Sequence, residues 1–192
     1  MKSATQATAS TTTNNINGVN VTQIMEVIGN IERNENYGKS QFRARNNWVN
    51  GGVNRSEIKE FRACCKEDIS RAQSFKLIND EPLFLAGDDR APNPVEYILH
   101  ALAGCPTTTM VYHASVQGIE IEAVESTYEG DIDLRGIFGI SDKVRKGYNA
   151  VRVNMKVKSQ ASAEQLTSLA MFSPVYEIIS KSLPVEFVLE TH

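Results

Sequence analysis

The sequence predicts one α+β domain with mainly antiparallel sheets around a long buried central helix. Residues 41–49 and 56–65 carry strand-like patterns on either side of a Gly-Gly turn, which is typical of a β-hairpin. Residues 95–116 form the most apolar segment of the chain. Strand-like segments follow without repeated βαβ units, and this order favours an α+β arrangement over an α/β one.

The composition is that of a single globular domain. Of the 192 residues, 41% are hydrophobic and 22% are charged, which is enough apolar material for one core. We expect a disordered tail over residues 1–17, an N-terminal helix within residues 18–35 capped by Asn20, and one domain over residues 36–192.

The first part of this domain should be a sheet. The hairpin predicted above turns at Asn50-Gly51-Gly52, and a further strand is expected at residues 73–78.

The central helix is marked by signals at both ends. Asn93 is a suitable N-cap, Pro94 fits the first helical position and Gly118 is a natural stop. Apolar residues lie all around its first half, so the helix should be buried on most sides. Pro106 removes one backbone donor, and we expect a kink or a break immediately after Cys105.

The last third of the chain predicts strands and short helices in turn. Alternating patterns at residues 119–123 and 151–158 predict strands with one wet face, joined by a long glycine-containing connection over residues 130–147. Helices are expected over residues 162–172 and 173–183, followed by a final strand at residues 185–190.

The net charge bears on the expected partners of the chain, and the cysteine content bears on its location. The formal net charge of -3 gives no basic footprint for nucleic acid or an anionic membrane, so neither is an expected partner. Three cysteines are too few for a disulfide scaffold and indicate a reducing, cytoplasmic location. The first residues lack the apolar run of a signal peptide. No sequence motif calls for a cofactor.

Cys105 is the main candidate for chemistry, either as a reactive thiol or as an inert core residue. Helical spacing places it in an apolar seam edged by hydroxyl groups, with Ile98, Ala101, Leu102, Thr108 and Thr109 on the same face. An apolar seam raises a thiol pKa, so a reactive Cys105 requires an Arg or Lys from another segment.

The other candidate groups carry weaker signals. Glu96 and His100 are four residues apart on one helical face, as expected for a structural pair or an oriented imidazole. A zinc site is weakly supported, because the chain has no CxxC or HExxH spacing and His100, Cys105 and His113 would not converge on one face of a straight helix. Cys64 and Cys65 are adjacent, which is too close for ordinary disulfide geometry, and neighbouring strand residues point to opposite faces.

The segment PNPVEYILHALAGC, residues 92–105, resembles the OsmC/Ohr (osmotically inducible / organic hydroperoxide resistance) family, in which a cysteine matching Cys105 is peroxidatic. The resemblance covers roughly residues 42–189, including the Gly118-Ile119 turn, EGDIDLRG and SPV. It implies an intertwined homodimer with the long helices at its centre.

Three positions depart from that pattern. The arginine that follows the Gly-Gly turn in the family is replaced by Val53, and Arg55 is the nearest substitute. The carboxylate position holds Val95, with Glu96 one residue later, and the second, resolving cysteine is replaced by Ser173.

Two hypotheses follow for the function. In the first, Cys105 with Arg55 and Glu96 reduces a small apolar hydroperoxide, and a low-molecular-weight or protein thiol restores the cysteine. In the second, a non-catalytic small-molecule-binding or stress protein has kept the fold and lost activation of the thiol.

Overall fold

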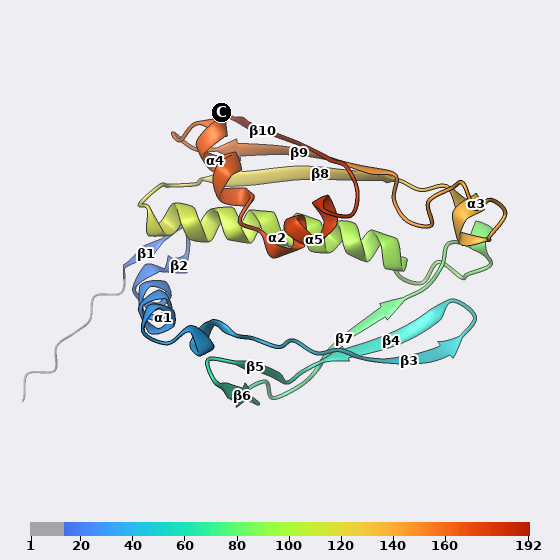
Figure 1. Cartoon of the computed structure of the whole chain (residues 1–192), viewed down its shortest axis with the longest axis horizontal. Coiled ribbons are helices and arrows are strands. Elements are labelled where there is room, and N and C mark those ends of the chain that lie inside the picture. Colours follow the sequence, from blue (N-terminus) through green and yellow to red (C-terminus); the bar gives the residue numbers. More distant parts are fainter. Residues whose placement is uncertain (1–13) are drawn as a thin grey trace, which may run out of the picture.

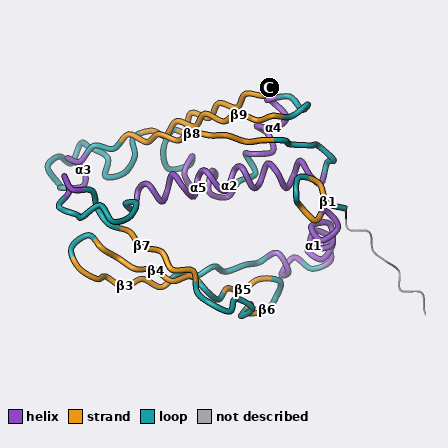
Figure 2. The backbone as a smooth tube through the Cα atoms, turned by 180° about the vertical axis from the view of Figure 1, so that it is seen from behind, coloured by secondary structure: helices purple, strands orange, loops and turns teal. Residues whose placement is uncertain are grey.

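Two groups of strands lie on opposite sides of one long helix. In the computed structural model, which describes residues 14–192, helix α2 (Pro94–Val116) runs between a C-terminal sheet and an N-terminal sheet (Figure 1). The view from behind shows the same order of layers (Figure 2). The predicted α+β class with mainly antiparallel strands is confirmed.

The N-terminal elements pack at the C-terminal end of α2. They are β1 (Asn15–Ile16), β2 (Val19–Asn20), α1 (Val21–Arg33) and the 3-10 turn Glu35–Gly38. The Asn20 side chain caps α1, as predicted. Residues 1–13 of the expected tail lie outside the described residues. Its expected end at residue 17 is wrong, because β1 pairs with β2 and the Asn17 side chain donates to the Ile119 carbonyl at 2.9 Å.

The N-terminal sheet has the order β3-β4-β7, with antiparallel pairing throughout. Its strands are β3 (Arg45–Asn50), β4 (Val53–Ile58) and β7 (Phe75–Asn79), so the hairpin at Gly51-Gly52 and the strand near residues 73–78 are confirmed. The returning strand is shorter than predicted. It ends at Ile58, and a separate hairpin of β5 (Phe61–Ala63) and β6 (Lys66–Asp68) follows.

Helix α2 begins as predicted and continues through Pro106. The Asn93 N–H donates to Glu96 Oε2 at 2.8 Å, and the Glu96 N–H donates to Asn93 Oδ1 at 2.9 Å, which is a complete capping box. A kink or a break was expected after Cys105, and the helix has no break there. The Pro106 ring is fully buried, and α2 continues through it with one backbone donor fewer.

The C-terminal sheet has the order β10-β9-β8 and covers one face of α2 (Figure 1). Its strands are β8 (Ala123–Asp131), β9 (Ala150–Lys158) and β10 (Val185–Thr191). The inward residues of β9 alternate with exposed ones, as predicted. They pack with α2 in two clusters, whose central members are Leu102, Met110, Ala114, Val151, Val153, Met155 and Val157.

Two predicted boundaries around β8 are wrong. The strand expected at residues 119–123 starts only at Ala123, because the Ile121 N–H donates to Asn17 Oδ1 at 2.8 Å and the Ile119 N–H donates to the Ala114 carbonyl at 2.9 Å. These two backbone N–H groups are therefore not available for pairing with β9. At its other end β8 extends to Asp131, into the expected connection, which also contains helix α3 (Leu134–Ile137).

The last elements largely follow the prediction. Helix α4 (Ala163–Ala170) is capped by Ser162, and helix α5 (Pro174–Ser180) is capped by Ser173 and ends three residues earlier than expected. Strand β10 pairs with β9 in parallel, and it is the exception to the antiparallel rule. Within residues 14–192, no helix has both the length and the apolar character needed to cross a membrane.

The capping box predicts a measurable stability effect. Asn93→Ala should lower the free energy of unfolding by about 1 kcal/mol, because the first turn of α2 loses a side-chain acceptor. Urea unfolding followed by circular dichroism measures this change. Asn93→Ser should recover most of it, and Asn149→Ala, at an exposed position, is the control. Equal losses in the Asn93→Ala and Asn149→Ala variants would contradict the role of the cap.

Candidate functional site

Cys105 lies half-buried near the middle of α2, on the side that faces away from the C-terminal sheet. Leu102, Pro106 and Met110 point into the core and are fully buried. The residues at helical spacing on the other side are exposed or half-buried and form what we call the open stripe: Ile98, Ala101, Cys105, Thr108 and Tyr112. The thiol is therefore accessible from the open side of the helix.

The residues predicted to surround Cys105 do not all lie on one side of the helix. Leu102 was expected on the thiol's face, but it belongs to the core beneath the helix. Ile98 is 42% exposed and Tyr112 is 45% exposed, so the outer half of the seam is uncovered in a single chain. Thr108 supplies a hydroxyl at its edge. The Cys105 thiol therefore lies beside a partly exposed, apolar surface.

Helix α2 supplies no permanent cation to its own cysteine. Residues 94–116 contain no Lys or Arg, and the two histidines of the helix are at positions 100 and 113. His113 stacks on Phe172, with ring centroids 4.6 Å apart. A positive group beside Cys105 must therefore come from another element.

Among the described residues, neither Arg55 nor Glu96 makes a hydrogen bond or an ion pair with Cys105. Arg55 is exposed on β4 and takes part in no ion pair among the described residues. The Glu96 carboxylate accepts the Asn93 N–H in the first turn of α2. Nine residues of helix separate it from Cys105, roughly 13 Å along the axis. The catalytic roles expected for Arg55 and Glu96 stay predictions.

A depression of about 430 Å³ opens beside the first turns of α2. Pro92, Glu96, Tyr97 and His100 line it, so Glu96 and His100 share one surface, as their spacing predicts. The Tyr97 hydroxyl donates to the Ile78 carbonyl at 2.6 Å and ties α2 to β7. This depression offers a carboxylate and an imidazole to a small molecule.

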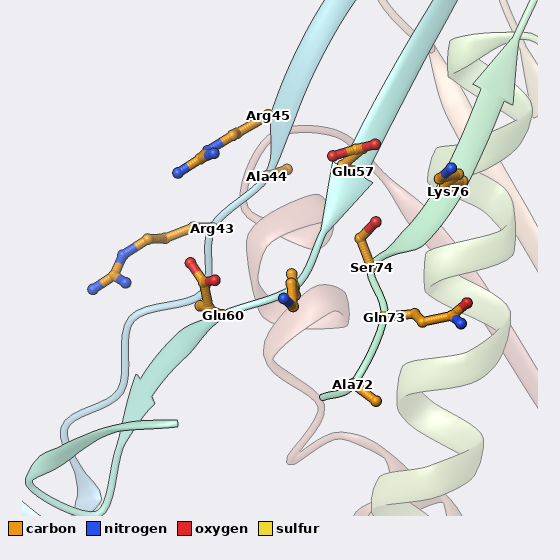
Figure 3. Close-up of a pocket in the computed structure, with 10 residues that line it drawn as sticks. Arg43, Ala44, Arg45, Glu57, Glu60, Ala72, Gln73, Ser74 and Lys76 are labelled. Atoms are coloured by element: carbon orange, nitrogen blue, oxygen red, sulfur yellow. The ribbon is translucent and has the colours of Figure 1, made fainter. Parts of the chain in front are cut away.

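A second depression, of about 470 Å³, lies on the N-terminal sheet (Figure 3). Arg45, Glu57 and Lys76 are in register across β3, β4 and β7, so they stand in one row on one face. Sequence reasoning missed this row, because strand pairing was needed to find it. Its charged lining contains no thiol and suits polar ligands rather than apolar ones.

The wall of this depression is held by an ion pair. Arg43 donates to both carboxylate oxygens of Glu67, each at 2.8 Å. The hydrogen bond from Arg43 lowers the pKa of the Glu67 carboxyl below its ordinary value, and the same bond raises the pKa of Arg43. Arg43 is therefore engaged in the structure, whereas Arg45 has no ion pair among the described residues.

Cys64 and Cys65 occupy the turn between β5 and β6 rather than one strand, so the expected opposite strand faces do not apply. Both have left-handed backbone conformations, with φ of 51° and 63°. Cys64 is half-buried, and its hydrogen bond with the Tyr37 hydroxyl raises the pKa of that hydroxyl. Cys65 is exposed and lines a depression of about 340 Å³ together with Lys39 and Arg62.

Two further questions from the sequence concern the position of the second cysteine and the presence of a metal site. Ser173 is fully buried, and its hydroxyl accepts the Tyr176 N–H at 3.1 Å as the cap of α5. In the part of the chain that the structure describes, no group of three or more His, Cys, Asp or Glu side chains could hold a metal ion.

The comparison with known families supports the interpretation of α2 and the C-terminal sheet. The model of the OsmC-like protein family matches residues 87–188, just over half of the chain. The chain belongs to the OsmC-like family. The matched residues of this OsmC-like chain include all of α2 with Cys105, and most of the C-terminal sheet. No curated protein sequence matches the chain.

Solved structures share the fold of the OsmC-like chain. An OsmC-like protein from Mycoplasma pneumoniae is 12% identical, with a TM-score of 0.59, and the match covers 79% of this chain and 96% of that one. An organic hydroperoxide resistance protein OsmC from Legionella pneumophila is 19% identical, with a TM-score of 0.51 and coverage of 78% and 96%. At these identities the similarity shows the fold alone.

The two adjacent thiols, Cys64 and Cys65, should differ in their reactivity toward a small alkylating reagent. Iodoacetamide in limiting amount should label Cys65 several-fold faster than Cys64, because Cys65 is exposed and Cys64 is half-buried against Tyr37. Peptide mass spectrometry measures each rate. Tyr37→Phe is expected to narrow the difference, and labelling of Cys64 as fast as Cys65 in the unchanged chain would contradict the arrangement.

Proposed function

We propose that this OsmC-like chain reduces organic hydroperoxides through Cys105, as part of an oxidative-stress response in the cytoplasm. The Cys105 thiolate attacks the distal peroxide oxygen, so that an S–O bond forms and the O–O bond breaks. The alkoxide takes a proton and leaves as an alcohol, and the sulfur is oxidised to a sulfenic acid. Detoxification is then complete for one peroxide molecule.

The sulfenic acid needs an external reductant. A low-molecular-weight or protein thiol condenses with it, which releases water and leaves a mixed disulfide, and a second thiol restores Cys105. Ser173 offers no sulfur at the position of the second cysteine, which supports a one-cysteine cycle. Cys64 and Cys65, in the turn between β5 and β6, are the second-choice partners.

The observation that carries the proposal is the placement of Cys105. A half-buried thiol on a partly apolar, uncovered helix face gives an apolar peroxide a surface to bind and a sulfur to attack. Family membership is consistent with this chemistry, and the related structure from Legionella pneumophila is called an organic hydroperoxide resistance protein.

The missing cation is proposed to come from a second copy of the chain. The open stripe of α2 is uncovered, and large apolar residues of the N-terminal sheet are exposed as well, with Trp48 at 69% and Val49 at 43%. Large exposed apolar surfaces commonly mark sites of interaction with a partner. In a homodimer the open stripes would meet, and Arg55 of the partner subunit would stand beside Cys105.

The homodimer is testable at the open stripe. Thr108→Arg should convert a dimer into a monomer, because a guanidinium would be buried where the two stripes meet. Size-exclusion chromatography with light scattering gives the mass. Thr127→Arg, at an exposed position of β8, is the matched control and should remain dimeric. A monomeric parent chain, or a dimeric Thr108→Arg variant, would refute this interface.

The peroxidase proposal is tested by rapid mixing with cumene hydroperoxide. Cys105→Ser should reduce peroxide consumption to the rate without protein, whereas Cys64→Ser and Cys65→Ser should keep the rate. Arg55→Gln should slow the reaction by ~10- to 100-fold at neutral pH, because the reacting thiolate would lose the positive charge proposed to stabilise it. Arg45→Gln, on the same sheet face, is the control.

The second candidate function is a non-catalytic binding or stress protein. Val53 favours it, because this residue stands where the family has an activating arginine and is buried, at 8% exposure. If Cys105 reacts with the peroxide no faster than free cysteine does, and Cys105→Ser keeps ligand binding, the binding function replaces the peroxidase.

A further inference from the structure

One end of the molecule combines exposed apolar side chains with cations that form no ion pair within residues 14–192. Helix α3 and the loop after it form this end and lie farthest along the axis of α2 on the N-terminal side of that helix (Figures 1 and 2). The Tyr148 hydroxyl donates to the Val95 carbonyl at 2.9 Å and anchors the end of the loop to the first turn of α2. We call residues 134–146 the tip loop.

The apolar side chains of the tip loop point into solvent. Ile137 is 51% exposed, Phe138 is 61% exposed and Ile140 is 71% exposed. Gly139 has a φ of 65°, which lets the chain reverse between the last two of them. Leu83 and Phe84, in the 3-10 turn shortly before α2, are 73% and 74% exposed.

Three cations border these side chains. Lys143, Arg145 and Lys146 are exposed and take part in no ion pair among the described residues. Arg135 is neutralised by Asp133. Asp142 is the one carboxylate within residues 134–146, so the tip loop is locally positive in a chain whose net charge is -3.

The apolar and cationic parts are held together as one unit. A Cβ added at Gly136 would lie 2.3 Å from the Arg145 carbonyl oxygen, so α3 is in close contact with the backbone of the cationic segment. The Ile140 N–H donates to the Arg135 carbonyl at 2.9 Å. The cations therefore stay next to the apolar residues.

We propose that the tip loop docks on the surface of an anionic lipid bilayer. Exposed apolar side chains that enter the acyl boundary and cations that attract anionic headgroups are the two components of peripheral membrane binding. If this surface met itself in a second copy, its unpaired cations would face like charges, which disfavours that occupant. The overall charge predicted no membrane partner, and the local distribution of charge reverses this for the tip loop.

The proposal is tested by sedimentation of the full chain with vesicles, without peroxide, so that the outcome is independent of Cys105 chemistry. Binding is expected to phosphatidylglycerol vesicles and not to pure phosphatidylcholine vesicles, and it should weaken as salt rises. Each of Lys143→Gln, Arg145→Gln and Lys146→Gln should lower the partition coefficient about fivefold.

The contribution of the exposed apolar side chains to vesicle binding is tested with a matched pair of isoleucine variants. Ile140→Ser should weaken binding several-fold, and Ile69→Ser, at a position that is 75% exposed in another part of the chain, should leave it unchanged. Circular dichroism checks folding, and the three charge variants keep the test valid if Ile140→Ser does not fold. Equal binding of the chain to the two kinds of vesicle would overturn the proposal. Equal loss of binding in the Ile140→Ser and Ile69→Ser variants would do the same, as would loss of the dimer in Ile140→Ser.

Discussion

The packing of α2 against the β10-β9-β8 sheet is the constraint on which the rest of the structure depends. Burying Leu102 and Met110 against the inward residues of β9 stabilises the fold by about 1.5–3 kcal/mol for each side chain. Because side chains three and four apart share a helix face, this burial also fixes what the opposite face presents. Cys105 and Tyr112 face outward as a consequence, and the thiol is placed by the core rather than by a dedicated loop.

The features that the sequence predicts well are those decided within a few residues. Asn93 and Ser162 cap their helices through side-chain bonds to the next turn, and the alternation of Val151–Lys158 specifies one buried face whatever surrounds it. The features that were predicted wrongly depend on distant contacts. Asn17 accepts the Ile121 N–H from 104 residues away, and no local pattern could show that β8 must begin later.

The same division applies to the candidate site. Helical periodicity alone placed Cys105 beside Ile98, Ala101 and Thr108, and the structure puts these residues on one open stripe. Periodicity could not locate the cation that we propose for Cys105, because the candidate Arg55 lies on β4, a strand of the other sheet. The spacing of residues along a sequence does not give the distance between two elements of a chain. It gives no information on the distance between two subunits.

On the proposed function, the composition of α2 means that the site needs a second structural element. A thiol that reacts with an apolar peroxide needs an apolar surface for the substrate and a positive charge for the thiolate, and these requirements oppose each other on one helix. Residues 94–116 meet the first requirement and contain no Lys or Arg for the second. A cation supplied by another element would meet both requirements. It would lose its hydration only when that element packs beside α2. On the proposed function, assembly of the dimer and activation of Cys105 are therefore one event, and the reactivity of the thiol is linked to protomer concentration.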